Sequence, residues 1–332
     1  DDLDKWGVLL YAKVGQKIIG TQRINIGQLR SFPPELTRIL ALYRFEKFAA
    51  EHGKQNYAYT SKLMVDPSYR NSAALHLLTA TGYELYCQHQ VQFNFGVCNF
   101  HLLRLYEQFG ARRYGWTFSA PGCDGVLAPF VVLVDDVEHL RRVRSPFYRK
   151  ARKRGTITSR AAEWFLREFS EANNFVNSQL IDQETFWSLL NKRFKRAPNK
   201  IIPFLRGLTT VEASLFLHGT GIVIPFRPGD YVALAGCMSH TLNILIAGRL
   251  GVYGAAGPGA DIVIPGQCFG TPGLAAQTVG REDIWAVSPA EVLVLSNLSF
   301  QKFRHTHPAI AAKILANLAA LTGEPAAAAT IA

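Results

Sequence analysis

The sequence predicts an α+β protein with a mixed sheet and helices, then a helical linker, then an antiparallel β-roll closed by a helix. Residues 1–152 alternate apolar strand-like runs with segments of helical periodicity. Residues 153–200 carry only helical patterns. Between residues 201 and 322, short strand-like runs are spaced by Gly and Pro and end in one helical segment, which is typical of a jelly roll. Residues 323–332 form an Ala-rich tail.

The composition is that of a globular chain: 332 residues, 48% hydrophobic and 18% charged, enough for two domains. No apolar run reaches the roughly 18 residues of a membrane span, and Asp1 does not begin a signal peptide, so we expect a cytoplasmic protein. The missing initiator Met suggests that residues before Asp1 are absent. Five cysteines without metal-type spacing indicate reduced packing residues and no metal site: Cys87, Cys98, Cys123, Cys237 and Cys268.

The net charge of +11 is concentrated in two clusters. Residues 141–154 hold eight Lys or Arg and residues 192–200 hold five, with no acidic residue in either. These clusters bracket the helical linker. They are either solvated ends of the linker or a docking surface for an acidic partner.

The elements of residues 1–152 follow from periodicity and turn residues. Strands are expected at residues 6–13, 17–25, 57–65, 91–97 and 125–136, the first two forming a hairpin. A helix opens at Pro33-Pro34 and runs to about residue 52. A second helix covers residues 73–84. A third, capped by Asn99, covers residues 100–109 and ends at Gly110.

The turn between the strand at 57–65 and the helix at 73–84 brings backbone N–H groups and a helix dipole to one point, which suits a pyrophosphate. The sequence Val-x-Pro-x-Tyr-Arg at residues 65–70, which is followed by small residues, resembles the acyl-donor loop of the GNAT acyltransferases. That loop usually reads Arg-x-x-Gly-x-Gly/Ala, so Ala73 and Leu75 stand where glycines are usual. The resemblance implies a donor site of Val65, Arg70, Asn71, Ser72, Ala73, Ala74, Leu75 and Asn99. The alternative is an ordinary strand–turn–helix.

Residues 105–111 read Leu-Tyr-Glu-Gln-Phe-Gly-Ala and resemble the GNAT sequence motif Leu-Tyr-x-x-x-Gly-Phe. In that family the tyrosine protonates the departing thiolate, so the resemblance gives Tyr106 the role of general acid. A phenol has a pKa near that of a thiol, which makes this transfer reasonable. The alternative is that Tyr106 belongs to the core of its helix.

Residues 18–24, Ile-Ile-Gly-Thr-Gln-Arg-Ile, resemble a strand shared by autoinducer synthases and N-acyl amino acid synthases, a GNAT branch. That branch commonly carries Glu-x-Ser-Arg on the next strand, where this chain reads Tyr59-Thr60-Ser61-Lys62 and lacks the carboxylate. The segment ending in Asp135, Asp136 and His139 also resembles the branch. We interpret its acids as solvated charges at a strand end, with a cation site as the alternative.

The linker pattern places apolar residues at helical spacing, including Trp164 and Phe165 in one helix and Phe186 and Leu190 in another. Two amphipathic helices would bridge the domains or form a homodimer surface. Beyond them, strands are expected at residues 221–225, 231–234, 241–246, 250–253, 285–287 and 291–295, with a closing helix at 307–321.

Residues 204–208, 226–230, 242–248 and 269–270 resemble the cyclic nucleotide-binding β-roll in order and spacing. The resemblance implies a pocket of Phe269, Gly270, Thr271, Arg281 and Glu282, with Arg281 pairing the cyclic phosphate. The family's ribose-binding Glu is replaced by Thr271, and Pro272 removes an N–H from the phosphate cradle. Acidic residues follow Arg281. We therefore expect weak or no affinity for cyclic AMP or cyclic GMP.

Together the resemblances imply an N-acyltransferase that moves an acyl group from acyl-CoA or an acidic acyl carrier protein to a small amine such as an amino acid. One alternative is a protein lysine acetyltransferase under cyclic-nucleotide control. Another is a non-catalytic acyl-binding or regulatory protein. A DNA-binding regulator would need a helix-turn-helix after the closing helix, and only residues 322–332 follow it, so we expect no DNA partner.

Overall fold

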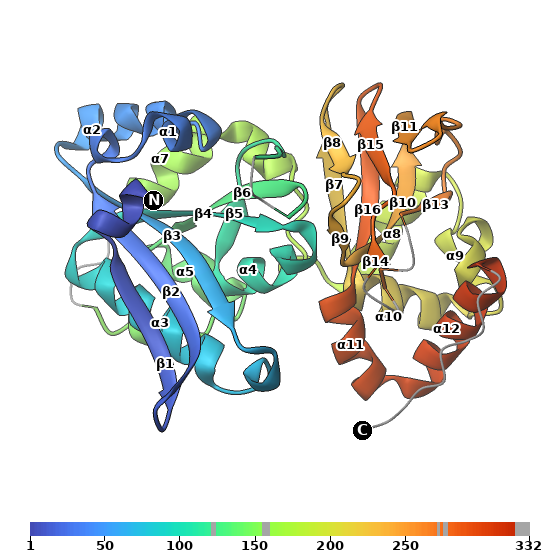
Figure 1. Ribbon diagram of the computed structural model, residues 1–332, viewed down its shortest axis with the longest axis horizontal. Helices are drawn as coiled ribbons and strands as arrows, with labels where there is room; N and C mark the ends of the chain where they lie inside the picture. Colours follow the sequence, from blue (N-terminus) through green and yellow to red (C-terminus); the bar gives the residue numbers. More distant parts are fainter. Residues whose placement is uncertain (121–123, 155–159, 271–272, 275–277, 323–332) are drawn as a thin grey trace. The chain divides into compact units, whose positions relative to one another are not determined.

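The computed structural model describes residues 1–120, 124–154, 160–270, 273–274 and 278–322. The chain divides into two compact units. The first comprises residues 1–98, 105–116 and 128–174, and the second comprises residues 99–104, 117–127 and 175–332. Each unit is described by itself below (Figure 1).

The first unit is a six-stranded mixed sheet with the strand order β1-β2-β3-β4-β6-β5. The strands are β1 (Val8–Val14), β2 (Lys17–Gly27), β3 (Asn56–Val65), β4 (Val91–Asn99), β5 (Ala111–Arg113) and β6 (Leu127–Leu133). β1 and β2 form the predicted hairpin, and β3 pairs parallel with β4. Helices α1 (Pro34–Ile39), α2 (Glu46–His52), α3 (Ala74–Gln88), α4 (Leu103–Phe109), α5 (Val137–Arg142), α6 (Tyr148–Ala151) and α7 (Arg160–Glu168) accompany it, with short 3₁₀ turns between some of them.

Strand alternation gives this sheet two separate cores. Tyr57 and Phe93 point into an aromatic core with Phe45 of the 3₁₀ turn η3 (Leu42–Phe45) and Trp164 of α7. Side chains on the opposite face pack against Tyr83 of α3 and other residues of α3–α6. The sheet is therefore buried on both sides, which fits the apolar runs in its central strands.

The helix predicted from Pro33 to residue 52 is wrong in one respect, because it is broken into α1, η3 and α2. Ala41 has a left-handed backbone, with φ of 47°. The break lets Leu40 and Leu42 both be completely buried, which a straight helix would not allow at positions two apart.

The acidic strand end is also not solvated. Asp135 is 4% exposed and is paired with Arg154, and the side chain of Asp136 lies 2.6 Å from Arg112. His139 is buried beside them. Because a buried carboxylate requires a partner, arginines of this unit fill the role that a bound cation would have filled.

The second unit contains the predicted β-roll. Its two four-stranded antiparallel sheets have the orders β13-β10-β16-β7 and β12-β11-β15-β8, and β14 pairs with β9. The strands are β7 (Gly221–Phe226), β8 (Tyr231–Ala233), β9 (Met238–Ser239), β10 (Thr241–Ala247), β11 (Leu250–Gly254), β12 (Gly257–Pro258), β13 (Cys268–Phe269), β14 (Thr278–Val279), β15 (Glu282–Ala286) and β16 (Ala290–Ser296).

Helices α8 (Gln183–Phe194), α9 (Pro198–Ile201), α10 (Thr210–Thr220), α11 (Asn297–Thr306) and α12 (Pro308–Thr322) accompany these sheets. α12 is the predicted closing helix, whereas α10 and α11 were not predicted. The segment 153–200, expected to form one linker, is divided between the units. Trp164 of α7 lies in a core of the first unit, and Phe186 of α8 lies in the core of the second.

Candidate functional site

The predicted donor loop is a tight turn held by its own side chains. Asp66 precedes the 3₁₀ turn η4 (Pro67–Tyr69), accepts a hydrogen bond from the Ser68 N–H at 2.9 Å and pairs with Lys17 at 3.0 Å. The Lys17 ammonium, and then the Ser68 N–H, hold the pKa of Asp66 below its ordinary value. The Ser72 hydroxyl donates to the Tyr69 carbonyl at 2.7 Å and accepts from the Ala74 N–H at 3.2 Å. The turn is thus formed before any ligand arrives.

The predicted donor residues differ in accessibility. Arg70, Asn71, Ser72 and Ala73 are exposed, Val65 and Leu75 are half-buried, and Ala74 is buried. A cavity of about 490 Å³ lies beside the loop and is lined by Ser72, Ala73 and Ala74 with mostly apolar residues of β1, β2 and α3. The other predicted donor residues do not line it.

The parallel pair of β3 and β4 separates along its length. Asn56 pairs with Val91, the register shifts between Asn56 and Tyr57, and the pairing then runs from Tyr57 opposite Phe93 to Tyr59 opposite Phe95, where it ends. Lys62 has φ of 52°, and the register of β2 against β3 shifts between Thr21 and Arg23. In Figure 1 the two strands run apart beyond this point. A bulge of this kind bends its strand and ends the pairing.

Tyr106 lies near both separating strands. Its ring centroid is 4.5 Å from that of Phe130, and its side chain is half-buried on α4. Burial raises the pKa of the Tyr106 phenol, and Cys98 of β4, Tyr86 of α3 and Tyr59 of β3 raise it further. The phenol therefore stays protonated at neutral pH and can donate a hydrogen bond.

A polar chain lies at the point where the strands separate. The Thr60 hydroxyl donates to Asn94 Oδ1 at 2.8 Å and lies 2.5 Å from the Tyr86 hydroxyl. Because a threonine hydroxyl has one proton, Tyr86 must be the donor in the second bond. This chain fixes the side chains on both strands at the start of the opening.

The predicted donor residue Asn99 lies in a different unit from the others. It is the last residue of β4 but belongs to the second unit, and its amide donates to the Asp124 carbonyl at 2.6 Å. It also makes no side-chain cap for the turn that follows, although a cap was predicted. The Asn99 amide nitrogen is thus engaged by Asp124, a residue of the same unit.

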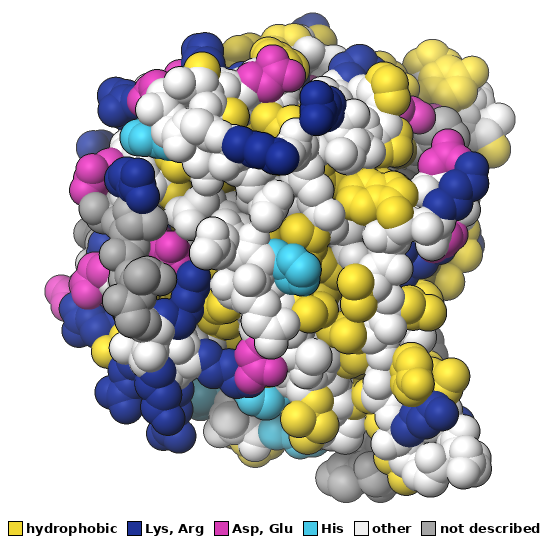
Figure 2. Space-filling model, turned by 90° about the vertical axis from the view of Figure 1, so that its left-hand side faces the viewer, with side chains coloured by type: hydrophobic (Ala, Val, Ile, Leu, Met, Phe, Trp, Pro, Cys, Tyr) yellow, Lys and Arg dark blue, Asp and Glu magenta, His cyan; other side chains and the backbone are white. Residues whose placement is uncertain are grey.

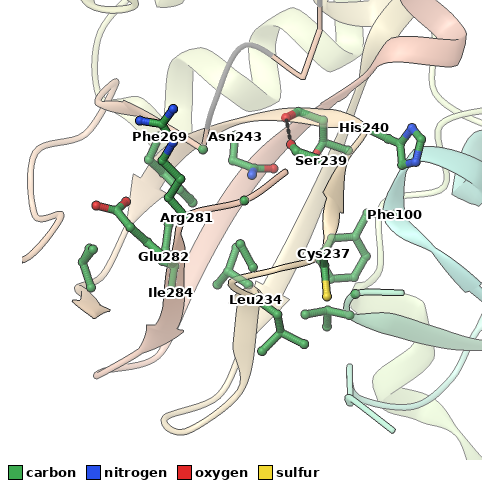
Figure 3. Close-up of a pocket in the computed structure, with 18 of the residues that line it drawn as sticks. Phe100, Leu234, Cys237, Ser239, His240, Asn243, Phe269, Arg281, Glu282 and Ile284 are labelled. Carbon is green, nitrogen blue, oxygen red and sulfur yellow. Dashed lines mark hydrogen bonds between the residues drawn. The ribbon is translucent and has the colours of Figure 1, made fainter. Parts of the chain in front are cut away.

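The second unit encloses a cavity of about 500 Å³ (Figure 3). Its apolar walls include Val232, Val252, Phe269 and Ile284, and its polar lining includes Cys237, Ser239, His240, Asn243, Arg281 and Glu282. Residues 99–101 and 124–126, which belong to the same unit, also line it. The sheets of the roll thus surround a space large enough for a small organic ligand.

Four of the five residues predicted for the nucleotide pocket line this cavity: Phe269, Gly270, Arg281 and Glu282. Thr271 lies outside the described residues, as does Pro272. Gly270 has φ of 74°, and a Cβ there would lie 3.2 Å from Asn243 Nδ2, so this position favours glycine. Arg281 and Glu282 are exposed, and Figure 3 shows both at one side of the drawn group, opposite Phe100 and His240.

Sequence reasoning missed Asn243. This residue is 3% exposed on β10, between the buried apolar residues Leu242 and Ile244. A lone polar residue inside a buried apolar run was the available signal, because such a residue needs a partner. The cavity also holds Cys237, whose thiol pKa is raised by burial and by Asp124.

Two carboxylates near the cavity are already engaged by backbone groups. Asp124 Oδ1 accepts from the Met238 N–H at 2.9 Å, and Asp283 Oδ1 accepts from the Ala235 N–H at 2.8 Å. Within the described ranges, no group of three His, Cys, Asp or Glu side chains could hold a metal ion. In the same ranges, no helix combines the length and apolarity that a bilayer crossing requires.

No family model matches the sequence, and no curated protein matches it. Among solved structures, the chain is similar to the N-terminal domain of a transcriptional regulator from Streptomyces coelicolor, at 15% identity and a TM-score of 0.34. This match covers 40% of this chain and 90% of that one. It is also similar to the Thermus thermophilus catabolite activator protein, at 22% identity and a TM-score of 0.32, over 36% of this chain and 56% of that one.

A third similar structure is a cyclic nucleotide-binding-like protein from Brucella abortus, at 21% identity and a TM-score of 0.28, over 32% of this chain and 98% of that one. Partial likenesses at this identity concern the course of the backbone in part of the chain. What either unit binds must therefore be argued from its own residues.

Proposed function

We propose that the first unit is an N-acyltransferase of the GNAT type, which moves an acyl group from acyl-CoA or an acyl carrier protein to a small amine. One observation carries the proposal: the Tyr106 ring packs on Phe130, and Phe130 packs on Gly96 of β4, the residue just after the last pair between β3 and β4. An open edge between parallel strands offers backbone groups to a linear ligand. The donor turn follows directly from β3.

The chemistry needs no covalent enzyme intermediate. The amine nitrogen attacks the thioester carbonyl, the C–N bond forms, and the C–S bond breaks. Tyr106 donates its proton to the departing sulfur, and the proton shed by the nitrogen restores the phenol, so the products are an amide and a thiol. Proximity and a backbone N–H aimed at the carbonyl oxygen would supply the remaining rate.

The acceptor amine must arrive unprotonated or lose its proton to water. In the related branch a strand carboxylate lies near the amine, and this chain has Lys62 in that stretch. The Lys62 ammonium is 2.8 Å from Asp4, which also pairs with Arg23 at 2.7 Å. Lys62 stands where the branch has an arginine, and Tyr59 stands where it has the acid, so this stretch carries an ammonium without a carboxylate of its own, which disfavours a cationic acceptor beside Lys62.

The second unit has the role of a ligand-binding or degenerate regulatory domain in this proposal. A second candidate is a lysine acetyltransferase controlled by a cyclic nucleotide, which the cavity lined by Arg281 favours. A non-catalytic acyl-binding protein is the third.

The test uses the full chain with acetyl-CoA, long-chain acyl-CoA and an acyl carrier protein, each with amino acids or a lysine peptide. Thiol release and the N-acylated product are measured together. An N-acyl amino acid supports the proposal, and an acetylated peptide supports the second candidate. Bound acyl donor without either product supports the third.

A further inference from the structure

The strongest unexplained feature is the buried amide of Asn243. Its Oδ1 is inaccessible to solvent and has no hydrogen-bond partner in the described part of the chain. Asn243 sits on β10 opposite Phe269 of β13 and Val294 of β16, so its strand neighbours supply only backbone groups. A buried carbonyl oxygen without a partner is costly and rare in folded proteins, which calls for an explanation.

The position of this amide points to a ligand. Figure 3 shows the Asn243 side chain in the middle of the group, between Arg281 and Ser239. Ser239 does not serve as its partner, because the Ser239 hydroxyl donates to the Thr241 carbonyl at 3.2 Å. The surrounding walls are apolar side chains such as Phe269 and Ile284, which are 7% and 2% exposed.

The charges of the cavity do not favour an anion. The guanidinium of Arg281 lines it together with the carboxylates of Asp124 and Glu282, and the imidazoles of His101 and His240 also line it. Since Arg281 and Glu282 are both exposed, solvent screens them, and neither dominates the buried part of the cavity. Of the amide side chains that line the cavity, those of Asn99, Asn243 and Gln267, the Asn243 side chain is the buried one, and buried apolar side chains surround it.

We propose that this cavity binds an uncharged heterocycle of the nucleobase or nucleoside class, whose N–H edge donates to Asn243 Oδ1. An Asn amide presents an acceptor and a donor side by side, which matches the adjacent N–H and ring nitrogen of adenine. Apolar walls suit the faces of a flat ring, and a space of about 500 Å³ is within the range of small-molecule sites. This inference does not depend on the acyl transfer proposed for the first unit.

The test is calorimetric titration of the full chain with adenine, adenosine, guanosine, cytidine and uridine, and with cyclic AMP and cyclic GMP. At least one uncharged compound should bind more tightly than either cyclic nucleotide. Asn243→Leu should weaken that binding roughly five- to a hundredfold, because the ligand's donor is left unpaired. Ser239 and Arg281 line the same cavity, so Ser239→Ala and Arg281→Ala serve as controls. Each should change the affinity for the uncharged compound less than threefold.

Thermal unfolding of ligand-free protein separates a binding role for Asn243 from a structural one. Asn243→Leu should be at least as stable as the native chain, because it removes an unpaired acceptor. A clear loss of stability would mean that Asn243 is bonded within the fold, and it would overturn the proposal. So would tighter binding of a cyclic nucleotide, lost in Arg281→Ala, or no binding by any base or nucleoside.

Discussion

Gly96 of β4 and Phe130 of β6 are packed so closely that a Cβ atom at residue 96 would lie 2.4 Å from Phe130 Cζ. Phe130 is 3% exposed and its ring is next to that of Tyr106, at 4.5 Å between centroids. The missing side chain at Gly96 therefore sets the place of Phe130 and, through it, the place of the phenol to which we give the acid role.

Gly96→Ala should lower the free energy of unfolding by about 1–3 kcal/mol, because the added methyl group overpacks the sheet face. It should also reduce turnover by shifting Phe130 against Tyr106. Urea unfolding and thiol release measure the two effects. Gly27→Ala is the matched control, since its nearest neighbour would be 3.4 Å away, an ordinary contact. Equal stability of both variants would contradict the packing argument.

Tyr106→Phe should lower turnover roughly 100- to 10,000-fold with little change in donor binding, because it removes only the proton donor. Tyr83→Phe is a useful comparison. The Tyr83 hydroxyl donates to the Val134 carbonyl at 2.6 Å, so its loss should cost about 1 kcal/mol of stability and leave turnover intact. A rate unaltered by Tyr106→Phe would make Tyr106 a packing residue.

The donor turn gives a prediction about backbone rather than side chains. Asn71→Pro removes the N–H of residue 71, and it forces Arg70 away from its helical backbone angles of φ −60° and ψ −29°. The exposed Asn71 side chain can be shortened without either effect. Donor affinity measured by calorimetry should be lost in Asn71→Pro and kept in Asn71→Ala. Similar affinities in the two variants would remove the loop from the donor site.

Strands with alternating apolar and polar residues, or with a continuous apolar run, could be predicted from the sequence. The closing helix could be predicted too, because each of these patterns lies within one short segment. α10 was missed although Thr209 and Glu212 form a capping box at its start, a signal present in the sequence. The apolar residues of α10 lie on several sides of the helix, so its sequence does not show the apolar residues along one face that identify an amphipathic helix. The break at Ala41 was not predictable, since it depends on how two leucines reach one core.

The residues of the candidate sites also fall into two groups: those that a sequence motif identifies, and those whose role depends on contacts in the folded chain. Arg281 and Phe269, which line the cavity, were predicted because a motif carries them. Asn243 was missed because its interest depends on the absence of a hydrogen-bond partner in the folded chain. Asn99 was assigned to the donor site by its order in the chain, and its bond to Asp124 depends on a residue 25 positions away. Sequence spacing alone cannot supply such a contact.

The basic cluster at residues 141–154 offers a test of the carrier-protein partner. Lys150 is paired with Glu84, so the reversal is best limited to the exposed Arg149, Arg152 and Lys153. Changing these three to Glu should slow association with an acidic carrier protein, most strongly at low salt, while activity toward acyl-CoA is retained.

Three exposed residues of the second unit that lie outside both basic clusters, Arg206, Arg249 and Lys302, provide the control for net charge. If reversing these residues to Glu slows association as much as the three changes in the first unit, the effect belongs to total charge and not to a docking surface. Equal losses with acyl-CoA and the carrier protein would instead indicate misfolding.

His139 makes stability depend on pH. Burial, then Arg112, lowers the pKa of this imidazole to about 3, although Asp136 opposes the shift. Between pH 6.5 and 3 the unfolded chain therefore binds a proton at His139 that the folded chain does not. The stabilisation is fully present above pH 6.5 and is lost as pH falls, by at most about 1.4 kcal/mol per pH unit.

His139→Gln lacks this proton uptake, so its free energy of unfolding should fall less between pH 6.5 and 4.5 than that of the native chain. Urea titrations at several pH values measure both slopes, and equal slopes would mean that the folded chain protonates His139 as readily as the unfolded one.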